Sequence, residues 1–383
     1  MSHPPSRSTP RRTPVGKRKS LRLGVLGIAL PLALVAAIAP TSSAAPIPEP
    51  TPGIVAQRTP ATANPLAGHA WGVYKGSADQ AWDPYVRSTG RQRALLAKIA
   101  LRPKAKWFGD WIPNSRIKEK VRDYIANSTG GDPDVLVQMT VFRMVPWEHD
   151  ACKRLPTRAE QASYKQWTDR FAAAIGGTHV ALILQPDGPF ALCAPRGSTL
   201  PSRLIAYSAK KFSALPHTSV YIDAGASDWP KDRPAESARF LVPAGVRYAR
   251  GFALNSTHYV STASDIDFGS RLVAELARRG LPGKHFVINT SSNGRPFDFS
   301  QARGSHPDNA KTCATKTETK CVTLGIPPTL AVGDPKWGLS ALNRARARRH
   351  VDGYLWFGRP WLFMQADPFD MKRALAMART TPY

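Results

Sequence analysis

The sequence predicts an α/β fold in which about seven parallel strands form a barrel-like domain, with its chemistry at their C-terminal ends. The first observation is the repeated alternation of short apolar runs with segments of helical periodicity, which is typical of a parallel sheet with helical crossovers. The second is their number, because seven units over about 300 residues fit one barrel better than two small doubly wound domains. The third is that polar residues follow several runs, at the strand ends where barrels carry their chemistry.

Strand-like and helix-like segments alternate along the chain from Asn64 onward. In the segment 159–175, Tyr164, Trp167 and Phe171 recur at the spacing of one helix face. The long polar segment 295–337 contains two cysteines and is expected to be an ordered loop held by a disulfide. The predicted strands are residues 104–108, 134–142, 179–184, 218–223, 249–254, 284–289 and 351–357, and predicted helices lie near 115–127, 159–175, 201–212, 264–279 and 338–350.

The N-terminal segment has the order of features found in secretory signals. Residues 1–44 hold seven Lys or Arg and no Asp or Glu, and an apolar stretch from Leu23 to about Pro40 precedes small residues. We expect a signal peptide over residues 1–44 and a secreted protein, with an uncleaved membrane anchor as the alternative. Residues 45–63, rich in Pro, Ala and Thr, predict a flexible linker, which leaves residues 64–383 as the main domain.

The formal net charge of the chain is +26, which favours anionic partners such as nucleic acid or an acidic cell envelope. Export argues against nucleic acid, and the basic residues are scattered instead of forming one stripe. An anionic envelope is therefore the expected charged partner, and the protein is expected to be a monomer. Charge alone would also suit a structural or adhesion protein of the cell wall.

The chain has four cysteines, all in the part expected to be exported. An even count in an oxidising compartment implies two disulfides, for which three connectivities exist. Their two clusters favour Cys152 with Cys193 and Cys313 with Cys321. Without a Cys-x-x-Cys motif or a His pair at ligand spacing, no metal site is predicted, and no cofactor is expected.

Two predicted strands each deliver an aspartate just beyond the last apolar position. Asp187 follows residues 179–184, and Asp223 ends residues 218–223. A carboxyl group at this edge of a parallel sheet faces a crevice where burial raises its pKa, which favours general acid chemistry. The alternative is that each aspartate caps the following helix.

Other predicted strand ends carry carboxylates, amides and tryptophans. Indole rings stack on pyranose faces, amides and carboxylates bond sugar hydroxyls, and one carboxylic acid can protonate a glycosidic oxygen. A sugar site is therefore expected. The strand-end segments concerned are Pro146–Cys152, Gln185–Asp187, Asp223–Trp229, Asn255–Tyr259 and Asn289–Gly294.

The order of these motifs resembles glycoside hydrolase family 6, whose members cut β-1,4-glucans with inversion. The resemblance extends over most of the chain, from Asn64 to about Pro360. The motifs that carry it are Asn64–Gly68, Lys106-Trp107, the Asp150/Cys152 region, Pro186-Asp187 with Cys193, Asp223–Gly225 with Trp229, Asn255 with Tyr259, Thr290–Gly294, Cys321, Leu324–Thr329 and Val351–Trp356.

The resemblance implies a seven-stranded distorted barrel and a role for each matched residue. Asp187 would be the proton donor, and Asp150 close by would raise its pKa by like-charge repulsion. Substrate-binding positions would be Asp223 as an acidic residue lining the cleft, Asn255 and Tyr259, with Trp107 and Trp229 as stacking platforms. The family also joins Cys152 to Cys193.

The sequence departs from the family after the last predicted strand. The family's Lys position is Gly358, and its Glu and Asp positions are apolar within Trp361–Met364. Because an inverting enzyme needs a base opposite the acid, Asp367 is the expected substitute, unless it is only a turn residue before the last helix. Without a base, the chain would be a glycan-binding protein on the same scaffold, which is the alternative to an enzyme.

Overall fold

The computed structural model describes residues 63–230 and 233–383. The predicted signal segment, residues 1–44, lies outside the described residues, as does all of the predicted linker 45–63 except its last residue. Within the described part, no helix is both long and apolar enough to cross a membrane.

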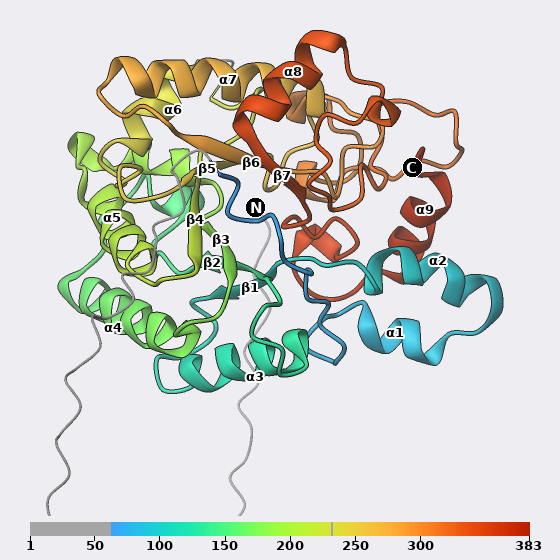
Figure 1. Cartoon of the computed structure of the whole chain (residues 1–383), viewed down its shortest axis with the longest axis horizontal. Helices are drawn as coiled ribbons and strands as arrows, with labels where there is room; N and C mark the ends of the chain where they lie inside the picture. Colours follow the sequence, from blue (N-terminus) through green and yellow to red (C-terminus); the bar gives the residue numbers. More distant parts are fainter. Residues whose placement is uncertain (1–62, 231–232) are drawn as a thin grey trace, which may run out of the picture. The chain divides into compact units, whose positions relative to one another are not determined.

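Seven parallel strands form one sheet in the order in which they occur along the chain (Figure 1). They are β1 (Lys106–Gly109), β2 (Val137–Phe142), β3 (Val180–Leu184), β4 (Thr218–Asp223), β5 (Gly251–Leu254), β6 (His285–Asn289) and β7 (Val351–Leu355). Across the gap between the first and last strands, the backbone N–H of Ala105 donates to the carbonyl of Trp356 at 2.8 Å. The predicted α/β barrel of seven parallel strands is confirmed, as a sheet curled into a partial barrel.

Each strand divides its side chains between two cores because successive residues point to opposite faces. In β3, Val180, Leu182 and Leu184 pack on the helix side, whereas Ala181 and Ile183 belong to the cluster that fills the barrel interior. Both faces are apolar, which explains why the strands appear in the sequence as continuous apolar runs.

Helices cover the outside of the sheet (Figure 1). The five predicted helices correspond to α3 (Ile117–Thr129), α4 (Arg158–Ile175), α5 (Leu200–Ser213), α7 (Thr262–Arg278) and α8 (Ala341–His350). Helices α1 (Trp82–Arg87), α2 (Gly90–Ala100) and α6 (Pro234–Leu241) were not predicted, and α9 (Met371–Thr380) packs against α2.

Helix α4 shows how local sequence sets these boundaries. The Thr157 hydroxyl accepts a hydrogen bond from the Glu160 N–H, and the Glu160 carboxylate accepts one from the Thr157 N–H. This capping box fixes the start of the helix, and its buried face, which includes Trp167 and Phe171, packs on the sheet.

Candidate active site

Asp187 follows β3 and faces a cavity of about 420 Å³ at the C-terminal ends of the strands. Its backbone is left-handed, with φ of 60°, a strained conformation for a residue with a side chain. The next residue must be glycine, because a Cβ at Gly188 would overlap the Asp223 carbonyl and the Phe240 ring. The sharp turn therefore aims the Asp187 carboxyl into the cavity.

Burial raises the pKa of Asp187 to about 6. The Thr257 hydroxyl, which donates to the carboxylate at 2.9 Å, and the charge of His258 act in the opposite direction. Two further carboxylates, Glu148 and Asp308, add to the increase by repulsion. Asp187 can thus remain protonated in mildly acidic solution, as a general acid must.

Asp223 lies behind Asp187, not in the cavity wall as predicted. Only 1% of the residue is exposed, and its carboxylate accepts hydrogen bonds from the Gly225 N–H at 3.0 Å and from the Ser256 hydroxyl. Burial and the neighbouring charge of Asp187 raise the pKa of Asp223 to about 7. Asp223 is thus a carboxyl neighbour of Asp187, and it is the charge of Asp187 that disfavours ionisation of Asp223.

The structure places Asp150 outside the cavity, which corrects the prediction that it lies beside Asp187. Its side chain is 70% exposed and pairs with Lys153 at 2.9 Å, and this bond keeps the pKa of Asp150 below its ordinary value. Residues 148–150 form one 3₁₀ turn, in which successive side chains point about 120° apart. The turn directs Glu148 and His149 toward the cavity, and Asp150 toward solvent.

The segment after β5 holds both aspartates, a role that was not predicted from the sequence. Ser256 bonds Asp223, and the adjacent Thr257 bonds Asp187. Asn255, predicted to bind sugar, is fully buried, and its amide donates to the Asn289 carbonyl at 3.1 Å. Asn255 therefore fixes the backbone of this segment and does not face the cavity. The only signal for the two hydroxyl groups was their position just past a strand end.

Tyr259 does not line the cavity either, although it was predicted to bind substrate. Its ring is buried and stacks on Phe297 at 4.8 Å. Its hydroxyl donates to the Pro307 carbonyl at 2.8 Å, which ties down the loop that carries Asp308. Tyr259 thus supports the cavity wall.

Trp107 and Trp229 both line the cavity, as predicted for stacking platforms. The Arg359 guanidinium lies 4.3 Å from the centre of the Trp107 ring, so one indole face carries a cation. Trp229 contacts Phe190 at 5.1 Å and His258 at 5.7 Å between ring centres. Each tryptophan also lines a different neighbouring cavity.

His258 supplies a positive charge to the groove. Burial lowers its pKa, but an ion pair with Asp228 at 2.7 Å outweighs this effect, and the net pKa is raised. Asp228 is itself oriented by the Phe299 N–H, which donates to it at 2.7 Å. The His258 ring stacks on Phe299 at 4.4 Å, which keeps the imidazole at the groove wall.

Asp367 lies outside the cavity that contains Asp187. It is exposed, accepts a hydrogen bond from the Gln80 amide at 3.0 Å and lines the adjacent cavity of about 430 Å³. Asp370 caps α9 by accepting from the Arg373 N–H. The structure therefore does not bring Asp367 into the cavity of Asp187, although its predicted role as substitute base required this.

Steric crowding explains why position 358 holds glycine and not the lysine found in the family. A Cβ there would come within 2.6 Å of the Asn289 amide nitrogen and 2.7 Å of the Ser256 carbonyl oxygen. Asn289 also accepts hydrogen bonds from the Phe357 and Gly358 N–H groups at 3.1 and 3.0 Å. The segment after β7 is thus packed directly on the loops that hold the two aspartates, and no side chain fits at Gly358.

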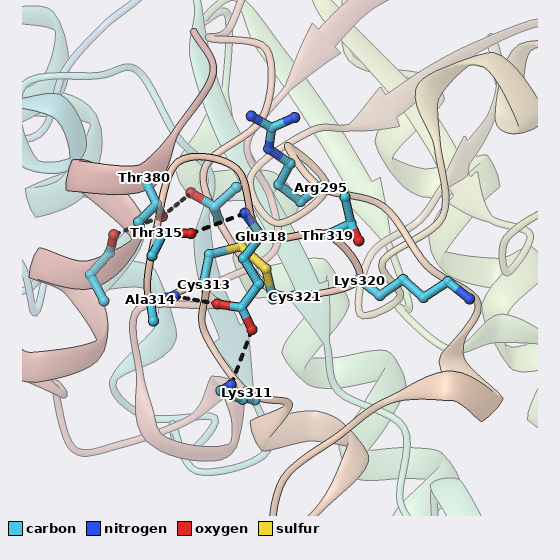
Figure 2. The surroundings of a disulfide bond; sticks show 12 residues. Arg295, Lys311, Cys313, Ala314, Thr315, Glu318, Thr319, Lys320, Cys321 and Thr380 are labelled. Carbon is cyan, nitrogen blue, oxygen red and sulfur yellow. Dashed lines mark hydrogen bonds and ion pairs between the residues drawn. A yellow bond between two sulfur atoms is a disulfide. The ribbon is translucent and has the colours of Figure 1, made fainter.

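Both predicted disulfides are present. Cys152–Cys193 joins the loop after β2 to the turn that follows Asp187. Cys313–Cys321 closes a short loop within residues 295–337 (Figure 2). Inside this loop, Glu318 accepts hydrogen bonds from the Ala314 N–H at 2.6 Å and from Lys311 at 3.0 Å. No cluster of three or more His, Cys, Asp or Glu suited to a metal occurs in residues 63–230 and 233–383.

The fold and this site define the family of the chain. The model for the glycosyl hydrolases family 6 matches residues 69–338, and the chain belongs to that family, which confirms the resemblance in its motifs. The matched range ends before the altered segment Trp361–Met364.

Proteins of similar sequence include endoglucanases, which is consistent with this family. The chain is 32% identical over 226 residues to endoglucanase A of Cellulomonas fimi, covering 58% of this chain and 47% of the relative, and so spans about half the length of that protein. It is 32% identical over 228 residues to endoglucanase 1 of Streptomyces halstedii, covering 57% of this chain and 67% of the relative.

Solved structures show the same fold. An endoglucanase from Mycobacterium tuberculosis, in complex with methyl-cellobiosyl-4-deoxy-4-thio-β-D-cellobioside, is 25% identical with a TM-score of 0.65, covering 83% of this chain and 99% of that one. A family 6 enzyme from Orpinomyces is 17% identical with a TM-score of 0.63, covering 84% and 99%.

Proposed function

We propose that this chain is a secreted glucanase that hydrolyses β-1,4-glucan, or a related polysaccharide, with inversion at the anomeric carbon. The observation that carries the proposal is Asp187, a carboxyl group with a pKa raised to about 6 inside an aromatic-lined groove. Asp187 would protonate the glycosidic oxygen as water attacks the opposite face of the sugar. The relatives named endoglucanases, and the thio-oligosaccharide in the Mycobacterium tuberculosis structure, support this substrate class.

Other residues have supporting roles in this proposal. Trp107 and Trp229 would stack on sugar rings on either side of the cleavage point. Glu148 and Asp308 would disfavour the charged form of Asp187 by repulsion, and Thr257 would orient the Asp187 carboxyl. Secretion is supported by the two disulfides, which persist in oxidising compartments. We also propose a monomer, with the charge of +26 favouring an anionic cell envelope.

The direct test is to incubate the purified protein with a panel of glucans and cello-oligosaccharides and to identify the anomer formed first by NMR. Release of α-configured reducing ends would support inverting hydrolysis of a β-linked glucan. Binding of cello-oligosaccharides with no product at any pH would contradict hydrolysis and favour the glycan-binding alternative.

The pH profile should report the raised pKa of Asp187. The acid must be protonated, so kcat/KM should fall about tenfold per pH unit above pH of about 6. Thr257→Val removes a hydrogen bond that favours the charged form of Asp187, so the alkaline limb should move to higher pH. Thr257→Ser keeps the hydroxyl and serves as the matched control. An alkaline limb that stays in place in Thr257→Val would contradict the assignment of this limb to Asp187.

A further inference from the structure

The reaction needs a second carboxylate in the cavity of Asp187. Asp150 and Asp367, the two predicted partners, both lie outside that cavity. Apart from Asp187, the carboxylates that line it are Glu148 and Asp308. Glu148 follows β2, next to the strand that carries Asp187, whereas Asp308 lies on the loop after β6. Asp308 therefore reaches the groove from the part of the curled sheet that borders β7.

The turn that carries Asp308 packs against the altered segment after β7. Residues Pro307–Asn309 contact Phe363–Gln365, and both segments contribute to the wall of the same cavity. The family's base follows the last strand, where this chain is apolar. Asp308, on the neighbouring loop, thus lies next to the segment after β7 in which apolar residues replace the family's acidic ones.

Both flanks of Asp308 are anchored. On one side, the Tyr259 hydroxyl donates to the Pro307 carbonyl at 2.8 Å. On the other side, the Arg373 guanidinium donates to the Ala310 carbonyl at 2.7 Å. The Cys313–Cys321 disulfide closes the next part of the loop (Figure 2). A carboxylate held from both sides loses little freedom when it orients a water molecule, which suits a base.

Burial and the neighbouring histidines have opposite effects on the pKa of Asp308. Partial burial raises the pKa of Asp308 on balance, although the electrostatic effect of three imidazoles opposes the increase. The His306 Nδ1 lies 3.5 Å from the carboxylate and accepts a hydrogen bond from the Asp308 N–H at 3.2 Å. The charged and titratable groups that share this cavity with Asp308 are the histidines His306, His258 and His149, the carboxyls Glu148 and Asp187, and Arg359. The histidines thus favour the carboxylate form that a base requires, against the larger opposing effect of burial.

We propose that Asp308 is the general base of this chain and replaces the base that is absent after β7. This inference rests on the proposed hydrolysis. The oxygen of a water molecule forms a bond to the anomeric carbon as the glycosidic C–O bond breaks. Asp308 accepts the proton that this water loses, and Asp187 gives its proton to the departing oxygen. Exchange with solvent then restores both groups.

The test compares Asp308→Asn with two matched variants, Glu148→Gln and Asp367→Asn, on cello-oligosaccharides and on an aryl cellobioside with an activated leaving group. We expect kcat of Asp308→Asn to fall by about 100-fold or more on both substrates, because an activated leaving group does not remove the need for a base. Oligosaccharide Kd should change by less than about threefold, and Asp367→Asn should keep kcat within about threefold of wild type. Sodium azide, a nucleophile that needs no base, should restore turnover of Asp308→Asn and yield the α-glycosyl azide.

Several results would overturn the inference. One is an Asp308→Asn variant that keeps more than about a third of wild-type turnover. Another is rescue by azide of Glu148→Gln and not of Asp308→Asn, which would make Glu148 the base. An inactive wild-type protein would instead refute hydrolysis itself, so the two failures are distinguishable. A thermal melt of Asp308→Asn, whose wild-type side chain is 38% exposed, checks that the fold is retained.

Discussion

Replacement of Asp187 by Asn should lower kcat on unactivated cello-oligosaccharides by about 10²–10⁴-fold while leaving their Kd nearly unchanged. Asn keeps the shape of the side chain and can still face Thr257, but it has no proton to give to the glycosidic oxygen. The loss should be much smaller on an aryl cellobioside with a good leaving group, because such a group departs without protonation. Steady-state kinetics on both substrates, with calorimetric binding, would measure this difference.

Asp150→Asn is the matched control for this experiment. Asp150 is exposed and paired with Lys153, so its replacement should change kcat by less than about threefold. Loss of turnover in Asp150→Asn comparable with that in Asp187→Asn would contradict the placement of Asp150 outside the site. Equal losses for Asp187→Asn on activated and unactivated substrates would contradict its role as acid.

The largest effect on stability is expected from Asp352→Asn, with a loss of about 3–5 kcal/mol in the free energy of unfolding. Asp352 lies in β7 with its side chain 2% exposed, and its carboxylate accepts hydrogen bonds from the Arg250 guanidinium and the Tyr221 hydroxyl. Asn would remove a buried counter-ion of the partly buried Arg250 charge, and breaking such a pair costs more than the pair itself contributes. Urea unfolding at neutral pH would measure the loss.

The pH dependence of this loss follows from the pKa of Asp352. Burial raises that pKa, but hydrogen bonds from Arg250 and His285 outweigh the effect, so the pKa lies below its ordinary value. The contribution of Asp352 is therefore complete above the unfolded pKa of about 4 and disappears as pH falls through the folded value. The difference between wild type and Asp352→Asn should shrink accordingly in acid.

Asp267→Asn is the control for stability. Asp267 pairs with Arg271 and Arg346, but its side chain is 41% exposed, and the expected loss is under about 1 kcal/mol. Similar losses for Asp267→Asn and Asp352→Asn would contradict the buried ion pair as the cause.

Some site residues were predictable because strand signals are local. An apolar run followed by a polar residue marks both the strand and the edge at which its side chains meet, which is why Asp187 was expected in this groove. Trp107 and Trp229, which line the same groove, were expected there from the resemblance to the family. The disulfides were also predictable, because two clusters of cysteine in the chain left few pairings.

Loop residues were harder because the direction of a side chain in a loop depends on contacts far away in the sequence. Asn255 lies at the expected strand end, yet its left-handed φ of 70° and its bond to Asn289 turn it into the fold. Tyr259 is likewise turned away from the cavity, because its hydroxyl donates to the Pro307 carbonyl in the loop that carries Asp308. Motif order alone could not distinguish a residue that supports the cavity from one that faces it.

The amino-acid sequence by itself determined the seven strands, the family and the position of Asp187, because apolar periodicity and strand-end residues depend on neighbours along the chain. Only the tertiary structure decided which carboxylates share a cavity with Asp187. The 3₁₀ turn of residues 148–150 exposes Asp150 to solvent and directs Glu148 into the cavity. The packing of the Pro307–Asn309 turn on the segment after β7 places Asp308 in the same cavity. These placements depend on contacts between distant segments, which exist only once the chain has folded.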